Sequence, residues 1–312
     1  MRCRGLVYAA LSLLSCSMLA IMSGRYDHLY SLLTPKIEDK PEIFDFVGPR
    51  ALSENSTYVK VKQKVRAVVL VQADAMGHLH KEYKELWLQY MNKEGRIKVF
   101  FVYGTSANFM HHQSSNDLIF PSIRDSYYYR LEEVLCAFNY VESNYEYDYI
   151  VRTNLNTFWI WPRLLSHLDT LPRRGVYEGH MPLPLDFPPY KRYYVSDSDT
   201  IISRGMIQLL LKDSSMLIYL VKLSKDRISA EATLGVYFHN LLKAPLQITT
   251  RECYVVQGKT EATESLLAAV LADMRPPSNS TRGPSHVLLN TPKAAKENVD
   301  VTLLKKLIES FY

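Results

Sequence analysis

The sequence predicts an α/β protein with a mixed, mainly parallel sheet flanked by helices, preceded by an N-terminal transmembrane helix. The parallel sheet follows from two apolar runs, residues 67–71 and 97–103, with a segment of helical spacing between them. A strand–helix–strand order of this length forms a βαβ unit, which has parallel strands and a right-handed crossover. The transmembrane helix follows from an uncharged stretch over residues 5–24.

This uncharged stretch comes directly after Arg2 and Arg4. About 20 residues span roughly 30 Å as a helix, which is enough to cross a bilayer. Basic residues before a span keep the start of the chain in the cytoplasm. We therefore expect an uncleaved signal anchor, with residues 1–4 as a cytoplasmic tail and the rest of the chain in the lumen. A cleaved signal peptide is the main alternative.

Two Asn-x-Ser/Thr triplets, at Asn55 and Asn279, are candidate N-glycosylation sites in polar surroundings. Together with the anchor they predict a single-pass type II membrane glycoprotein of the Golgi or the ER. Residues 25–62 contain three prolines and no sustained period, so we expect a stem there. Residues 63–312 are then the lumenal domain.

Composition restricts what the lumenal part binds. The chain has 312 residues and a formal net charge of +5, without a long Lys/Arg run. Nucleic acid is therefore not implied, whereas a small anionic substrate is compatible. Cys136 and Cys253 are the cysteines outside the tail and the span. In an oxidising compartment they could form a disulfide; two buried free thiols are the alternative.

The other elements are predicted from apolar spacing. Strands are expected at 117–120 and 149–151, and helices at 78–91, after 125–128, at 163–168, at 206–211, near Glu231 and at 301–311. Residues 181–190 contain four prolines, and residues 275–297 are rich in Pro, Ser, Asn and Lys. We expect the first segment to be an irregular loop that walls a cleft, and the second to be a surface excursion.

The expected strand at 149–151 ends in polar side chains, among them Arg152, Asn154 and Asn156. In an open α/β sheet, ligands bind at the carboxyl ends of the strands. Two asparagines that are separated by one residue can converge on one ligand. Capping of a turn is the alternative for both of them, and an internal ion pair is the alternative for Arg152.

Four motifs, in their order along the chain, resemble the beta-3-glycosyltransferase family, which includes galactosyltransferases and the Fringe proteins. The motifs are Asp117-Leu-Ile-Phe with Asp125-Ser-Tyr-Tyr, Tyr147-Asp-Tyr-Ile-Val-Arg-Thr-Asn-Leu-Asn, Phe187-Pro-Pro-Tyr with Tyr194-Val-Ser-Asp-Ser-Asp-Thr-Ile-Ile-Ser, and Glu231-Ala-Thr-Leu-Gly-Val-Tyr. The resemblance implies a GT-A-like fold. It also implies transfer of a sugar, with inversion, from a UDP-linked donor to a hydroxyl of a glycan or glycoprotein.

The resemblance also assigns roles to individual residues. Glu231 stands where the family has its catalytic base; a first-turn acid stabilised by the helix dipole is the alternative. Asn154 and Asn156 replace the family's aspartates, which hold Mn²⁺ or Mg²⁺ against the donor diphosphate. Since asparagine adds no negative charge, Arg152 is expected to bind and neutralise the diphosphate.

Asp197 and Asp199 replace glycines of the family's Ser-Gly-x-Gly motif, and we expect them to contact substrate; a solvated turn is the alternative. The His78-x-His80 and His111-His112 pairs lack further ligands at zinc-site spacing. The second class of function is a catalytically inactive lumenal protein of the same fold that binds glycans or stabilises a partner. The asparagines in place of aspartates favour this second class.

Overall fold

The computed structural model describes residues 61–73, 79–105, 114–124, 130–179, 182–187, 190–226, 228–242, 246–248, 254–257, 268–272, 286–290 and 296–312. The expected tail, transmembrane helix and all but the last two residues of the stem lie outside these ranges, as do both glycosylation triplets. Within the described ranges, no helix is long and apolar enough to cross a membrane.

A seven-stranded sheet with the order β12–β8–β11–β6–β2–β3–β4 forms the centre of the fold. Its strands are β2 (Ala67–Gln72), β3 (Ile97–Thr105), β4 (Asp117–Arg124), β6 (Tyr149–Asn154), β8 (Tyr177–Gly179), β11 (Asp199–Ser203) and β12 (Leu246–Ile248). All neighbouring strands are parallel except where β11 pairs with β6 and β8. The predicted mixed, mainly parallel sheet is confirmed.

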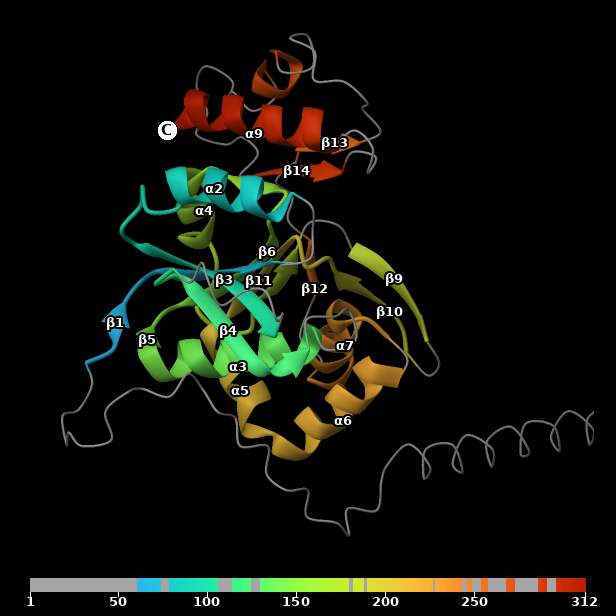
Figure 1. Ribbon diagram of the computed structural model, residues 1–312. Helices are drawn as coiled ribbons and strands as arrows, with labels where there is room; N and C mark the ends of the chain where they lie inside the picture. Colours follow the sequence, from blue (N-terminus) through green and yellow to red (C-terminus); the bar gives the residue numbers. More distant parts are fainter. Residues whose placement is uncertain are drawn as a thin grey trace, which may run out of the picture. The chain divides into compact units, whose positions relative to one another are not determined.

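Helices cover both faces of this sheet (Figure 1). One face carries α2 (His80–Tyr90), α4 (Trp161–Leu168) and α9 (Lys296–Phe311); the other carries α3 (Arg130–Asn144), α5 (Arg204–Lys212), α6 (Ser214–Asp226) and α7 (Ala230–Gly235). Each face has its own apolar core. Along β6, Tyr149 and Val151 pack into the α2/α4/α9 core and Ile150 into the α3/α5/α6/α7 core, as strand alternation requires.

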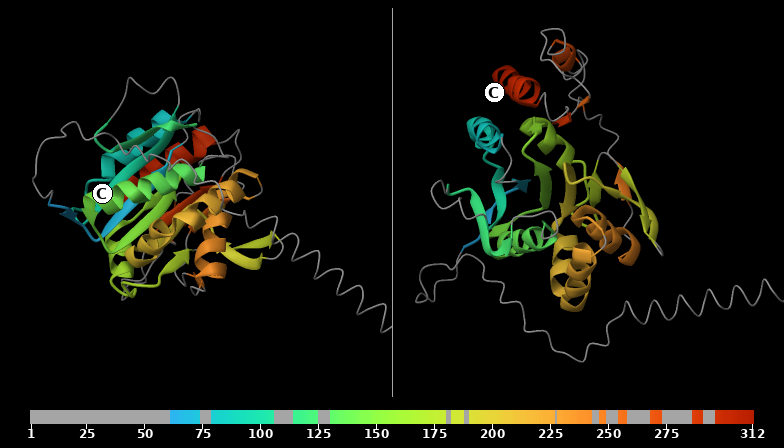
Figure 2. Two further views of the ribbon diagram at one scale, coloured as in Figure 1. Left: turned by 90° about the horizontal axis from the view of Figure 1, so that it is seen from below. Right: turned by 45° about the vertical axis from the view of Figure 1, so that its right-hand side comes forward.

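Three smaller sheets complete the described fold. β7 (Thr157–Trp159) pairs with β14 (His286–Asn290), which pairs with β13 (Tyr254–Gln257). β9 (Pro182–Phe187) and β10 (Tyr190–Val195) form an antiparallel ribbon, and β1 (Gln63–Lys64) pairs with β5 (Tyr145–Glu146). The view from below in Figure 2 shows α3 and the orange helices across one face of the central sheet.

Two predicted irregular segments contain strands instead. The two prolines of β9, Pro182 and Pro184, are compatible with the β9–β10 ribbon, because a two-stranded ribbon leaves alternate backbone N–H groups unbonded. Residues 286–290 form β14 inside the expected surface excursion, since the pairing with β7 and β13 gives this short run partners on both sides. Helix α6 was not predicted from the sequence.

Cys136 lies on α3 as a half-buried free thiol. Its burial, together with the nearby carboxylates of Glu132 and Glu133, raises its pKa to about 12. Cys253 lies outside the described residues. Cys136 is thus free among the described residues, and its pairing with Cys253 stays a prediction.

Strand β10 is packed tightly between β8 and α7 at two glycines. A Cβ atom added at Gly179 would lie 2.4 Å from the Cβ of Val195, and one added at Gly235 would lie 2.3 Å from the Cβ of Tyr194. Side chains at these two positions would collide with β10. The absence of a side chain at Gly235 therefore lets α7 dock directly against β10, one turn after Glu231.

We expect Gly235→Ala to destabilise the fold by about 2–3 kcal/mol, because the new methyl group overlaps atoms next to a backbone that cannot easily move. Gly205→Ala is the matched control: it is also a helical glycine, but the nearest atom to its added Cβ is Arg174 Cγ at 3.9 Å. The control should be neutral or stabilising by up to about 1 kcal/mol. Chemical denaturation measures both variants, and equal effects would contradict the proposed packing.

Candidate functional site

The candidate site begins at the carboxyl end of β6. Arg152 lies on the face of the sheet that carries α7, and its side chain is only 3% exposed. Asn154 is the last residue of the strand and is half-buried. The antiparallel strand β11 begins beside them, with Asp199 opposite Thr153 and Thr200 opposite Arg152.

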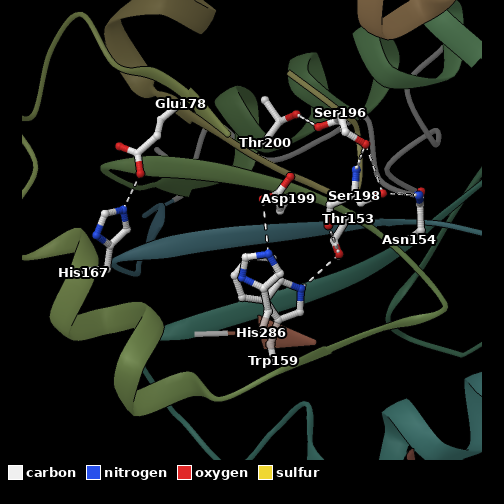
Figure 3. Close-up of polar contacts among 10 residues, drawn as sticks. All are labelled: Thr153, Asn154, Trp159, His167, Glu178, Ser196, Ser198, Asp199, Thr200 and His286. Atoms are coloured by element: carbon white, nitrogen blue, oxygen red, sulfur yellow. Dashed lines mark hydrogen bonds and ion pairs between the residues drawn. The ribbon is translucent and has the colours of Figure 1, made fainter. Parts of the chain in front are cut away.

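The turn of residues 196–198, which leads into β11, places Asp197 next to Asn154. The Asn154 amide donates to Asp197 Oδ1 at 3.2 Å and to Ser198 Oγ at 3.1 Å. The hydroxyl of Thr153 donates to the Ser198 carbonyl at 2.7 Å, and the hydroxyl of Thr200 donates to the Ser196 carbonyl. Figure 3 shows the bonds that Asn154, Thr153 and Thr200 make with Ser198 and Ser196 of the turn.

Glu231 reaches the same place from the first turn of α7. Ser229 caps this helix, because its hydroxyl accepts a hydrogen bond from the backbone N–H of Ala232 at 3.3 Å. The carboxyl group of Glu231 lies beside that of Asp197, and the two form a hydrogen bond. The structure thus brings together Arg152, Asn154, Asp197 and Glu231, all of them predicted site residues.

Asp197 and Glu231 share one proton. Burial raises the pKa of Asp197 to about 7, with a further contribution from the charge of Glu231 and the hydrogen bond to it; Arg152 and Asn154 act in the opposite direction. Burial also disfavours ionisation of Glu231, but the hydrogen bond from Asp197 and the charge of Arg152 hold its pKa below the ordinary value. Asp197 is therefore the protonated partner below about pH 7, and it donates to an ionised Glu231.

The other two predicted residues are Asn156 and Asp199. Asn156 is half-buried in the turn between β6 and β7. Asp199 is 2% exposed and lies on the opposite face of the sheet, where its Oδ2 atom is 3.2 Å from Nε2 of His286. The structure therefore separates Asp197 from Asp199.

The donor set of the site is a poor fit for a resident divalent cation. Asn154 directs its N–H groups, not its carbonyl oxygen, at Asp197 and Ser198. Arg152 already supplies a positive charge beside the two carboxyl groups. Among the described residues, no group of three or more His, Cys, Asp or Glu side chains is placed to hold a metal. A cation lodged between these groups would meet N–H hydrogens and a like charge, whereas Mn²⁺ and Mg²⁺ take oxygen ligands.

Sequence reasoning assigned no role to several polar residues of the sheet and its helices. Gln72 ends β2 opposite Asn154 in the sheet register, and its amide donates to Glu133 Oε2 at 3.0 Å. On the other face, His167 Nε2 lies 2.5 Å from Glu178 Oε1. The position of Gln72 after an apolar strand could have suggested its place, whereas the His167–Glu178 pair joins α4 to β8 and has no local signal.

No protein-family model and no curated protein matches the chain. Among solved structures, the chain is similar to the crystal structure of a glycosyltransferase involved in the glycosylation of the major capsid of PBCV-1. The identity is 8% and the TM-score 0.41, over 78% of this chain and 99% of that chain. A likeness at this level does not define a family for the protein.

The shared proton predicts a pH dependence of stability. Between about pH 4, where a free aspartate titrates, and about pH 7, the folded protein holds the Asp197 proton and the unfolded chain does not. The free energy of unfolding should therefore fall as pH rises across this window, by at most about 1.4 kcal/mol per pH unit. The lowered pKa of Glu231 acts in the opposite sense, but only at the acidic end of the window.

Asp197→Asn should remove this dependence, because the amide keeps a hydrogen-bond donor toward Glu231 and does not titrate. Denaturation series at several pH values between about 5 and 7.5 compare the variant with the wild type. Equal slopes in the two proteins would contradict the shared proton.

Proposed function

We propose that the protein is a membrane-anchored glycosyltransferase with a GT-A-like fold, acting in the lumen of the Golgi or the ER. The reaction is the inverting transfer of a sugar from a UDP-linked donor to a hydroxyl of a glycan or glycoprotein. The observation that carries the proposal is the position of Glu231 beside Asp197, Asn154 and Arg152 at the carboxyl edge of the parallel strands. This is the edge where open α/β sheets bind ligands.

Glu231 has the properties that the base of such a reaction needs. It is ionised at neutral pH and half-buried, so that an acceptor can reach it. The acceptor O–H bond breaks toward Glu231 while the acceptor oxygen bonds to the anomeric carbon. The bond from that carbon to the diphosphate breaks on the opposite side, and UDP leaves with the electron pair. One base on the face opposite the leaving group gives inversion.

Asp197 and Arg152 determine how this base titrates. The hydrogen bond from Asp197 and the charge of Arg152 both favour the ionised form of Glu231. A lower pKa keeps Glu231 unprotonated, but it also makes Glu231 a weaker base. General-base catalysis requires a balance between these two effects. Arg152 and the amide of Asn154 would also face the donor diphosphate in place of a metal ion, because a guanidinium is permanently charged.

Glu231→Gln tests the proposal. We expect loss of about 10²–10⁴-fold in the transfer rate, since a positioned general base typically contributes this much. Donor affinity should stay nearly unchanged, because the amide keeps the size of the side chain. The measurements are sugar transfer by the full chain in detergent and titration calorimetry with the nucleotide sugar. Equal turnover in the variant would remove Glu231 from the mechanism.

The same calorimetry separates the enzyme from the non-catalytic alternative. A screen of nucleotide sugars, with and without Mn²⁺, should give binding of at least one donor. If no nucleotide sugar binds while glycans do, the protein is a lumenal binder of the same fold. The asparagines at 154 and 156 are the feature of the sequence that favours this outcome.

Transfer should persist in EDTA, because Arg152 supplies the positive charge that a cation would otherwise bring. Arg152→Ala should weaken donor binding at least about tenfold, equal to about 1.4 kcal/mol, and Asn156→Ala should weaken it less. Circular dichroism of both variants controls for folding. Complete loss of transfer in EDTA with recovery in Mn²⁺, together with a harmless Arg152→Ala, would instead make Asn154 and Asn156 metal ligands.

A further inference from the structure

We infer that Trp159 and His286 position Asp197 from the opposite face of the sheet, acting through Thr153 and Asp199. The inference deepens the proposed function and rests on it for its catalytic consequence. These two residues would be positioning residues, because they act on Asp197 through other residues. They come from β7 and β14, which pair with Trp159 opposite His286.

The first connection is the hydroxyl of Thr153. It accepts a hydrogen bond from Trp159 Nε1 at 3.0 Å and donates one to the Ser198 carbonyl at 2.7 Å. A hydroxyl has a single proton, so the bond from Trp159 leaves that proton directed at Ser198. Thr153 and Trp159 are buried, and water does not compete for either bond. Figure 3 shows Trp159, Thr153 and Ser198 in this sequence.

The second connection is the pair of His286 and Asp199. The His286 ring stacks on Trp159 at a centroid distance of 4.4 Å and an interplanar angle of 24°. Its Nε2 atom contacts Asp199 Oδ2, and both side chains are buried. Asp199 follows Ser198 directly, so the two connections end on consecutive residues beside Asp197. Breaking a buried pair of this kind would leave a polar group without a partner, which is costly. We therefore expect the two side chains to stay in this arrangement.

The position of the turn determines how Asp197 meets Glu231. From the site side, Asn154 holds the turn by the bonds to Asp197 and Ser198. From the opposite side, Thr153 holds the Ser198 carbonyl. If the hydrogen bond from Thr153 is lost, Asp197 can move toward solvent and away from Glu231. Both changes lower its pKa, because burial and the neighbouring Glu231 are what raise it.

Trp159→Phe tests this inference, because it removes the indole donor and keeps an aromatic ring beside His286. Trp161→Phe is the matched control: Trp161 is buried in the same core, but its Nε1 donates to the Tyr90 carbonyl at 3.0 Å. The readout is the titration of Asp197 in the full chain in detergent, by the infrared C=O band of the protonated acid. The band that disappears in Asp197→Asn identifies it.

We expect the Asp197 midpoint to fall by about one pH unit or more in Trp159→Phe and to stay unchanged in Trp161→Phe. The titratable and charged groups that surround Asp197 are Glu231 from α7 and Arg152 from β6, with Tyr177 of β8 next to these two. All of them are present in both variants. A midpoint shift confined to Trp159→Phe is therefore caused by loss of the hydrogen bond to Thr153 and not by a change of neighbouring charge.

Thr153 provides a second pair of variants in case Trp159→Phe does not fold. Thr153→Val keeps the shape but removes the hydroxyl, whereas Thr153→Ser keeps the hydroxyl. We expect the midpoint to fall in the valine variant and to recover in the serine variant. Unchanged midpoints in folded Trp159→Phe or Thr153→Val protein would overturn the inference. The titration needs no donor or acceptor, so its result does not depend on whether Glu231→Gln abolishes transfer.

Discussion

The reversed direction of strand β11 is the constraint on which the candidate site depends. Parallel strands bring their carboxyl ends to one edge of a sheet, and an antiparallel strand brings its amino end to that same edge. Because β11 runs against β6, Asp199 lies opposite Thr153 and the turn before it lies beside Asn154. In a parallel orientation the turn would lie at the other end of a five-residue strand, about 17 Å away.

Charge balance explains why these residue types occur together. Arg152 contributes one positive charge, Glu231 one negative charge, and Asp197 and Asn154 none while Asp197 keeps its proton. Half-buried charges are costly unless they are compensated, so this set is close to neutral. In the proposed mechanism, the permanent charge of Arg152 takes the place of a cation.

Much of the fold and of the site could be predicted from the sequence because the signals are local. Apolar runs predicted β2, β3 and β6, and the polar residues after β6 predicted the edge where the site lies. The hydrogen bond between Asp197 and Glu231 could not be predicted, because it depends on the docking of α7 against β10 at Gly235. The prolines of residues 181–190 predict a loop, so the β9–β10 ribbon could not be predicted. His286 was missed because a polar segment surrounds a strand that tertiary pairing stabilises.

The bonds of Thr153 and Asp199 on the opposite face of the sheet hold the turn of residues 196–198 more firmly than the bonds within the site can. Asp197 lies in a half-buried turn, yet its hydrogen bond to Glu231 requires a fixed position. A hydrogen bond that competes with water contributes only about 1 kcal/mol, so the bonds of half-buried Asn154 hold the turn weakly. Bonds in a dry interior are electrostatically stronger, and those of Thr153 and Asp199 lie there. The turn is thus accessible on one face of the sheet and held in position from the other. For this reason His286 of β14, far along the chain, affects the site.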